Sequence, residues 1–366
     1  MQRKLCLLWG IISIFGLEAR AAKTILEQTF EDSDGGWMTY GQGGELRVTH
    51  DAENVKTGKG ALEFEYQIAS KQIAVAIFPV FDVSLAPMKS LRLWLKTDSA
   101  TPVAVLLSER KPDGGDYTAV VWSPKNTWQQ IELTPDQFAL NEGSNDPKDP
   151  DGKLDLDEVQ AVGILDLSQY LNTLPENPKL PLLIERHSGT HRLYIDDFQV
   201  SSEAPSAGKP RDYVGWFTLG GAQLSLDSSG KPVPGRAVKA EYDQAEGRFV
   251  LLMQLLAGVD LHKADRLAVD LASDKKATVV ISLEKRNPGG PAPRYTTMVE
   301  IPGGRQVAHE EIPFADFKLD ENGPKDPDPK LDVSKIKSVS LLDITAALTH
   351  ETARNTIWLG TVRGLP

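Results

Sequence analysis

The sequence has almost no cysteine, because the single one among its 366 residues is Cys6, inside an apolar run near the start of the chain. The rest of the chain therefore has no disulfide and no thiolate metal site. The sequence also lacks a Gly-x-Ser-x-Gly elbow and a His-Glu-x-x-His pair. Nothing among its acidic residues singles out a carboxylate pair of the kind that glycosidases use. We therefore expect a protein that is not an enzyme.

Long apolar runs are missing too, since no stretch after residue 21 approaches the 18 or so apolar residues of a membrane span. Residues 1–21 carry Arg3 and Lys4, an apolar run from Leu5 to Leu17 and small residues around Arg20, which is typical of a secretory signal peptide. We expect residues 1–21 to be removed from a secreted or periplasmic protein without membrane insertion. Removal takes away three basic residues and one acidic residue, so the net charge falls from −11 to −13. Nucleic acid is not an expected partner.

An acidic, proline-rich stretch occurs twice. Pro147-Lys-Asp-Pro-Asp151 returns 177 positions later as Pro324-Lys-Asp-Pro-Asp328, and Ile164-Leu-Asp-Leu-Ser168 matches Leu341-Leu-Asp-Ile-Thr345. The chain is therefore a tandem repeat. We expect the following division of the chain: signal peptide 1–21, first domain 22–202, linker 203–210, and a divergent second domain 211–366.

The repeated stretch invites comparison with a calcium-binding EF-hand loop. With Gly152 at the sixth position of such a loop, Pro147 falls at the first position, where a carboxylate is needed. The second copy has Pro329 in place of the glycine and Lys335 in place of the final acid. We therefore interpret the stretch as a stiff crossing loop that buries Leu154 against its domain.

Short runs of alternating apolar and polar residues predict strands along most of the chain, separated by Gly, Pro, Asp and Asn. Examples are Leu62-Glu-Phe-Glu-Tyr66 and Leu91-Arg-Leu-Trp-Leu95. No segment of a dozen residues has a sustained helical face. The fold class is therefore all-β, with two tandem β-sandwiches.

The residues of the first copy resemble a known family. Phe30-Glu31-Asp32, Trp37, Gly60-Ala-Leu-Glu-Phe64 and Tyr194-Ile-Asp-Asp-Phe198 resemble the galactose-binding-like jelly roll of bacterial carbohydrate-binding modules. The nearest in style are carbohydrate-binding module family 11 and the complex I intermediate-associated domain. The resemblance implies that both domains are jelly rolls and that the first binds carbohydrate.

The same resemblance implies a structural calcium ion in the first domain, because such modules often hold one between their first and last strands. Calcium prefers hard oxygen ligands. The acids that would supply them are Glu31, Glu53, Asp196 and Asp197. In the second copy Gly360 and Thr361 stand where the last two acids stand. We therefore expect calcium in the first domain only, with the alternative that these are solvated strand-end acids.

A sugar site requires exposed aromatic rings beside carboxylates and guanidinium groups. If the leucines of the 91–95 strand face the core, Trp94 lies on the opposite face between two cations. The alternative is that Trp94 covers a loop or packs on the other domain. In the second copy Asp270 replaces Trp94, so the first domain is the better candidate. The residues expected to line one concave, polar face are Glu65, Arg92, Trp94, Arg110, Tyr117, Trp122 and Asp166.

Together these features predict an exported, non-catalytic protein that binds polysaccharide or oligosaccharide on the first domain. One alternative is a structural or adhesion module of the cell envelope that binds other exported proteins. Another is a glycan-active enzyme whose carboxylate pair the sequence does not reveal.

Overall fold

The structure, a computed structural model, describes residues 24–366 except 70–71, 111–113, 143–145, 148, 173–183, 206–212, 245–248, 260 and 288–289. The predicted signal peptide and most of the predicted linker lie outside these residues. Within the described part, no helix is long and apolar enough to cross a membrane.

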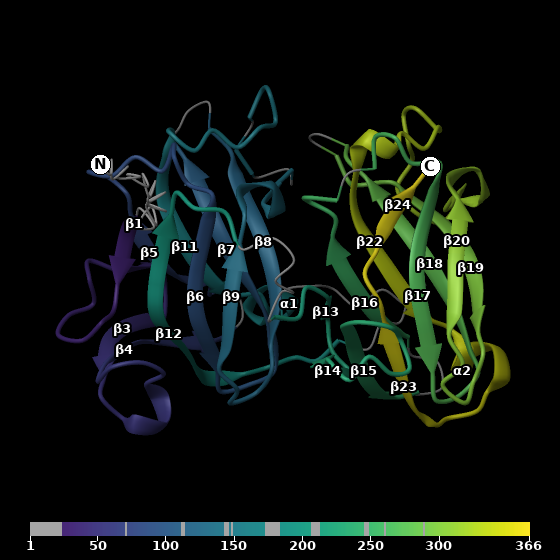
Figure 1. The fold of residues 1–366 in the computed structure, drawn as a ribbon, viewed down its shortest axis with the longest axis horizontal. Helices are drawn as coiled ribbons and strands as arrows, with labels where there is room; N and C mark the ends of the chain where they lie inside the picture. The colour runs from purple at the N-terminus through teal and green to yellow at the C-terminus, as the bar shows by residue number, and fades with distance from the viewer. Residues whose placement is uncertain are drawn as a thin grey trace, which may run out of the picture.

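The chain folds as two β-sandwiches that lie side by side, each made of two six-stranded antiparallel sheets (Figure 1). In the first sandwich, sheet 1A has the order β3-β4-β12-β6-β9 with β1 also paired to β12, and sheet 1B has the order β10-β8-β7-β11-β5-β2. The strands of sheet 1A are β1 (Thr24–Gln28), β3 (Gly44–Thr49), β4 (Ala61–Ile68), β6 (Ser90–Thr97), β9 (Gln129–Leu133) and β12 (Gly189–Ser201). Those of sheet 1B are β2 (Met38–Gly41), β5 (Ala74–Pro79), β7 (Thr101–Glu109), β8 (Asp116–Ser123), β10 (Ala139–Leu140) and β11 (Val159–Asp166), which the short helix α1 (Ser168–Leu171) follows.

The second sandwich repeats this strand order. Sheet 2A runs β14-β15-β23-β17-β20 with β24 paired to β17, and sheet 2B runs β13-β16-β22-β18-β19-β21. The strands of sheet 2A are β14 (Ala222–Asp227), β15 (Ala237–Asp243), β17 (Arg266–Ser273), β20 (Ala308–Pro313), β23 (Arg354–Leu359) and β24 (Arg363–Leu365). Those of sheet 2B are β13 (Phe217–Thr218), β16 (Val250–Leu255), β18 (Ala277–Lys285), β19 (Arg294–Ile301), β21 (Lys318–Leu319) and β22 (Ile336–Asp343), followed by α2 (Thr345–Thr349). The predicted all-β fold of two tandem sandwiches is confirmed.

The period of two along each strand explains the layers. In β6, Leu91, Leu93 and Leu95 are fully buried, whereas Arg92 and Trp94 between them are half-buried on the outer face. Side chains of sheets 1A and 1B that point inward form one core, and those of sheets 2A and 2B form a second. Burial of alternate side chains is therefore what fixes the register of each strand.

Each core also contains one aromatic residue from the other side of the domain boundary. Trp122 of β8 packs into the second core, and its backbone N–H donates to the carbonyl of Val214 at 3.0 Å. Tyr213, at the start of the second copy, packs into the first core, where its hydroxyl accepts from Gln137 Nε2 at 2.7 Å. The sandwiches are therefore joined through their interiors and not only through the predicted linker.

An ion pair reinforces this junction. Arg286, after β18, contacts both carboxylate oxygens of Glu142 in the first copy, with N–O distances of 3.1 Å. The Glu142 side chain is only 9% exposed. The acidic loop of the first copy lies beside the same guanidinium, since a Cβ at Gly152 would lie 3.0 Å from Arg286. The loop thus helps to seat one domain on the other.

Candidate functional site

Three of the predicted ligand-binding residues share the outer face of sheet 1A. Trp94 lies on β6 opposite Asp196 of β12, and the ammonium of Lys56 lies 4.4 Å from the centre of its ring. Arg92, two residues earlier, donates to the side-chain oxygen of Gln199 at 2.8 Å. Trp94 is half-buried beneath the loop that follows β3. This is the alternative considered above, in which the indole covers a loop.

Glu65, the third, belongs to a row of ion pairs on the same face. It accepts two hydrogen bonds from the Arg192 guanidinium, at 2.9 and 2.6 Å. Beside it, Arg47 contacts Glu63 at 2.5 Å, and Arg192 also lies 3.2 Å from Glu63. The charges of this face are therefore matched to one another across neighbouring strands.

The other predicted residues lie elsewhere, so the expectation that all seven line one open face is wrong. Tyr117 points into the first core, because it lies on the same face of β8 as the core residues Ala119 and Val121, and its hydroxyl donates to the Asp149 carboxylate of the acidic loop. Trp122 lies in the domain junction. Arg110, exposed after β7, donates to the backbone carbonyl of Asp157 at 2.9 Å.

Asp166 is fully buried at the end of β11. Its carboxylate accepts hydrogen bonds from the hydroxyls of Tyr66 and Thr101 and from the backbone N–H of Ser168. Burial, and then the carboxylate, raise the pKa of Tyr66 well above its ordinary value. The second copy repeats the arrangement, since Asp343 accepts from the Tyr242 hydroxyl at 2.6 Å. Both copies thus keep a buried tyrosine–aspartate hydrogen bond at one end of the sandwich. We interpret this pair as structural.

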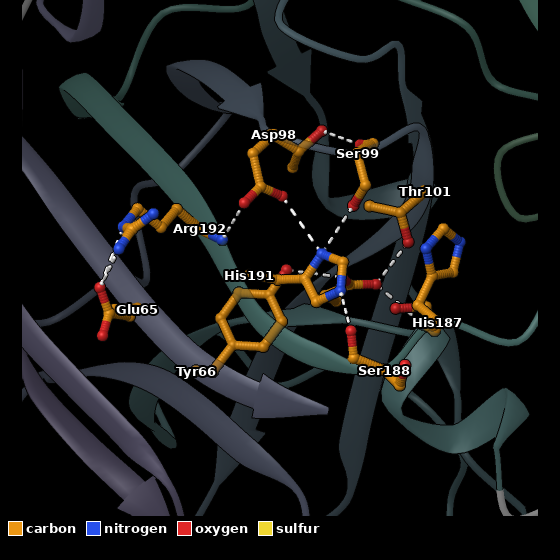
Figure 2. A network of polar contacts seen from close by, with 12 residues as sticks. Glu65, Tyr66, Asp98, Ser99, Thr101, His187, Ser188, His191 and Arg192 are labelled. Atoms are coloured by element: carbon orange, nitrogen blue, oxygen red, sulfur yellow. Dashed lines mark hydrogen bonds and ion pairs between the residues drawn. The ribbon is translucent and has the colours of Figure 1, made fainter. Parts of the chain in front are cut away.

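A polar network surrounds His191 at this end of the first sandwich (Figure 2). Its Nδ1 lies 3.3 Å from Asp98 Oδ1 and 3.3 Å from Ser99 Oγ, and its Nε2 lies 3.2 Å from the carbonyl of Ser188. The hydrogen bond to Asp98 raises the pKa of His191 and outweighs its partial burial. A nucleophile, base and acid in series would need the serine and the aspartate on opposite nitrogens of the ring. Here both contact Nδ1, so the network is not such a triad.

The four acids predicted to hold calcium do not converge. Asp196 is fully buried, and its two oxygens accept from the backbone N–H groups of Lys56 and Thr57 and from the Thr57 hydroxyl, at 2.8 to 3.0 Å. Glu31 accepts from the N–H of Lys59 at 2.8 Å. Backbone donors of one loop thus occupy both carboxylates.

The remaining two acids have other surroundings. The side chain of Glu53 is exposed, and its backbone carbonyl accepts from the Lys96 ammonium at 2.7 Å. Asp197 lies 3.8 Å from the Arg92 guanidinium. Across the described ranges, no group of three or more His, Asp or Glu side chains has the geometry of a metal site. As arranged, these residues do not fit a common ion, and calcium stays a prediction.

The sequence did not reveal the outer face of sheet 1B as a candidate. Tyr40 and Met38 of β2 lie opposite Val75 and Ile77 of β5, and they are 69% and 52% exposed. Val75 is buried on this face with Ala104, Leu165 and the half-buried Ile77 and Leu106 around it, apart from the main core. The alternation of Met38, Thr39 and Tyr40 was the available signal, but four residues are too few to predict a strand.

Tyr170 of α1 adds a second exposed ring to this part of the molecule, with 44% of its surface accessible. Burial of the rest, followed by the nearby carboxylates of Asp146 and Asp116, raises the pKa of Tyr170. Asp116 begins β8 and accepts a hydrogen bond from the Ser108 hydroxyl of β7. Aromatic rings, a hydroxyl and carboxylates thus belong to one sheet and the helix that follows it.

Comparison with known proteins gives similarities of low identity. No protein-family model and no curated relative matches the sequence. A family 11 carbohydrate-binding module of a cellulosomal cellulase from Clostridium thermocellum is 14% identical, with a TM-score of 0.37, over 50% of this chain and 98% of that one. A tandem pair of family 22 modules from Paenibacillus barcinonensis is 13% identical, with a TM-score of 0.31, over 94% of this chain and 98% of that one.

Proposed function

We propose that this chain is an exported, non-catalytic carbohydrate-binding protein whose glycan lies on the outer face of sheet 1B. The observation that carries the proposal is the exposure of Tyr40, at 69%, on a sheet face with an apolar floor. Flat, exposed aromatic rings can stack on the C–H faces of pyranoses. Tyr170, which is 44% exposed on the helix that follows β11, supplies a second ring. A polysaccharide or oligosaccharide is the ligand that such a surface suits.

Polar groups elsewhere on the same sheet match the hydroxyls of a sugar. The carboxylate of Asp116 and the hydroxyl of Ser108 point to the outer face, because they alternate with the core residues Tyr117 and Leu107. Carboxylates accept hydrogen bonds from sugar hydroxyls more strongly than neutral groups do. These groups would fix the orientation of a glycan whose stacking on tyrosine supplies most of the affinity.

The outer face of sheet 1A is a poorer candidate for the same ligand. Lys56 lies over the ring of Trp94, and Arg192 is already paired with Glu65. A sugar would have to displace these partners, and each displacement costs the free energy of the bond that it breaks. On sheet 1B, by comparison, 69% of the Tyr40 side chain is already exposed.

The non-catalytic part of the proposal rests on the groups around His191. Its two ring nitrogens face Asp98, Ser99 and a backbone carbonyl, so it has no nitrogen directed at a bound substrate. Asp166, the most deeply buried carboxylate nearby, is occupied by the donors of Tyr66 and Thr101. General acid or base work would require one of these groups to exchange a proton with substrate.

Affinity gel electrophoresis on soluble polysaccharides tests the proposal with two matched variants. Tyr40→Ala removes an exposed ring from sheet 1B, and Trp94→Ala removes one from sheet 1A. We expect the first variant to lose at least tenfold in affinity for a glycan that retards the native chain. The second should keep its affinity. Retention by Tyr40→Ala together with loss by Trp94→Ala would transfer the site to sheet 1A, and no retardation with any glycan would refute the function.

A further inference from the structure

The first sandwich closes one end of its interior with four aromatic rings. The ring of Trp37 lies 6.3 Å from Phe30, 5.8 Å from Phe78 and 5.4 Å from Phe198, centre to centre. The indole is 3% exposed. Such tilted and edge-on pairs are favourable contacts in a core. The four rings leave the end of this sandwich filled.

Strand register identifies the counterparts of this aromatic cluster in the second sandwich. Ala76 and Leu252 occupy equivalent places opposite Ile164 and Leu341, so Phe78 corresponds to Gln254. Met38 and Phe217 pair with equivalent residues of the next strand, so Trp37 corresponds to Trp216.

The last strand supplies the third counterpart. Gln199 pairs with Arg92, and Arg363 pairs with Ala268 at the equivalent position of β17. Phe198 therefore corresponds to Val362. The second copy keeps the tryptophan and replaces two of the three phenyl rings around it with an amide and a smaller aliphatic side chain.

These replacements open a cavity of about 580 Å³ in the second sandwich. Trp216, Gln254 and Val362 all line it, together with Tyr213 and two arginines. Its size falls within the roughly 300–1,000 Å³ of typical ligand pockets. The side-chain oxygen of Gln254 is buried and has no hydrogen-bond partner among the described residues. An amide in place of a phenyl ring is costly in a sealed core but useful beside a ligand hydroxyl.

The charge of the cavity is opposite to that of the chain. Two guanidinium groups, Arg236 and Arg363, line it, and no aspartate or glutamate of the described part of the chain does, although the net charge of the chain is −11. Gly360 and Thr361 line the cavity at the positions of Asp196 and Asp197 in the first copy, so uncharged residues replace two acids in its wall. The Arg363 side chain is 53% exposed and forms an ion pair with the carboxylate of Asp270 at 3.5 Å. An anion is therefore the favoured occupant.

We infer that this cavity is a second ligand site, which takes the uronic acid end of an acidic saccharide. The ring of Trp216 would pack against the sugar, Gln254 would bond a hydroxyl, and Arg363 would pair with the carboxylate. The inference rests on the proposed function for the class of ligand, a saccharide, but not on the face of sheet 1B. In the first sandwich the aromatic cluster fills the equivalent space.

Isothermal titration of the full two-domain chain with trigalacturonate, and with the same trisaccharide after carboxyl reduction, tests the inference. We expect the acid form to bind at least tenfold more tightly than the reduced form at low ionic strength. Val362→Phe restores the ring of the first copy and should abolish binding of the acid form. Arg363→Gln should weaken the acid form at least fivefold and leave the reduced form unchanged.

Lys276→Gln is the matched control, because it removes the same charge from an exposed pair with Glu300 in the same domain. It should change neither titration. The inference is overturned if the native chain binds neither trisaccharide, if both forms bind equally, or if Arg363→Gln binds like Lys276→Gln. Should Val362→Phe fail to fold, the arginine variant alone decides. Retardation by neutral polysaccharides and its loss in Tyr40→Ala test the proposed function separately, so the two can fail independently.

Discussion

Replacing Trp122 with alanine should uncouple the two sandwiches. This indole is 2% exposed and belongs to the second core, although its backbone is part of the first sandwich. Its removal leaves a cavity in the second core, whose buried residues include Val214 and Trp216. The substitution should therefore reduce the free energy that couples the two domains more than it reduces the intrinsic stability of either domain.

The magnitude follows from the buried area of the side chain. A tryptophan buries roughly 150–250 Å², which at about 25 cal/mol per Å² corresponds to about 4–6 kcal/mol of lost transfer free energy. Measured tryptophan-to-alanine changes in cores cost about 3–5 kcal/mol. We therefore expect a loss of about 4 kcal/mol. Trp94→Ala, which removes a half-buried ring from a sheet surface, should cost about 1 kcal/mol.

Urea denaturation followed by circular dichroism measures this difference. The native chain should unfold in one transition, because each core contains a residue of the other domain. Trp122→Ala should unfold in two transitions, each with a smaller dependence on urea, because each then exposes the surface of one sandwich. A single transition with a loss no larger than that of Trp94→Ala would refute the reasoning.

Three further predictions concern charge. Because the pKa of His191 is raised in the folded chain, its stabilising contribution is complete in mild acid and is lost as the pH rises through the folded pKa. The variant for comparison is His191→Asn, which copies Asn355 of the second sandwich. The melting temperature of the native chain should therefore exceed that of the variant by more at about pH 5.5 than at about pH 8. A double-mutant cycle of Glu142→Gln and Arg286→Gln, read by urea denaturation, should give a coupling free energy of about 1 kcal/mol, and zero coupling would contradict the ion pair. The calcium prediction requires the melting midpoint to fall when a chelator is added to the native chain but not to Asp196→Asn, and an unchanged midpoint refutes it.

The repeat made most of the fold predictable from sequence. Alternation in the 62–66 and 91–95 segments identified β4 and β6 with their correct inward faces, because one buried side of an antiparallel sheet imposes a period of two. Short edge strands such as β2 escaped prediction, since four residues carry too little pattern. The interior exchange of Trp122 and Tyr213 also escaped, because a sequence does not show which outward face meets another domain.

The candidate site was only partly predictable for the same reason. Parity placed Trp94 and Arg92 correctly on the outer face of sheet 1A, but Lys56 comes from a loop whose path alternation does not describe. Asp166 looked available in the sequence because the buried hydroxyls that bond it come from residues about 65 and 100 positions away. Comparison with Asp343, in the second copy, was the one signal that could have identified its structural role.

The exchange of Trp122 and Tyr213 also has a practical consequence for dissection of the chain. A fragment that ends within residues 206–212 keeps Trp122 but lacks the second core into which this indole packs. The same fragment loses Tyr213, whose phenol ring belongs to the first core. A fragment that begins there has the complementary defect. Two halves of a gene duplication have thus become mutually dependent, and the smallest piece worth expressing, crystallising or grafting onto another protein is the pair.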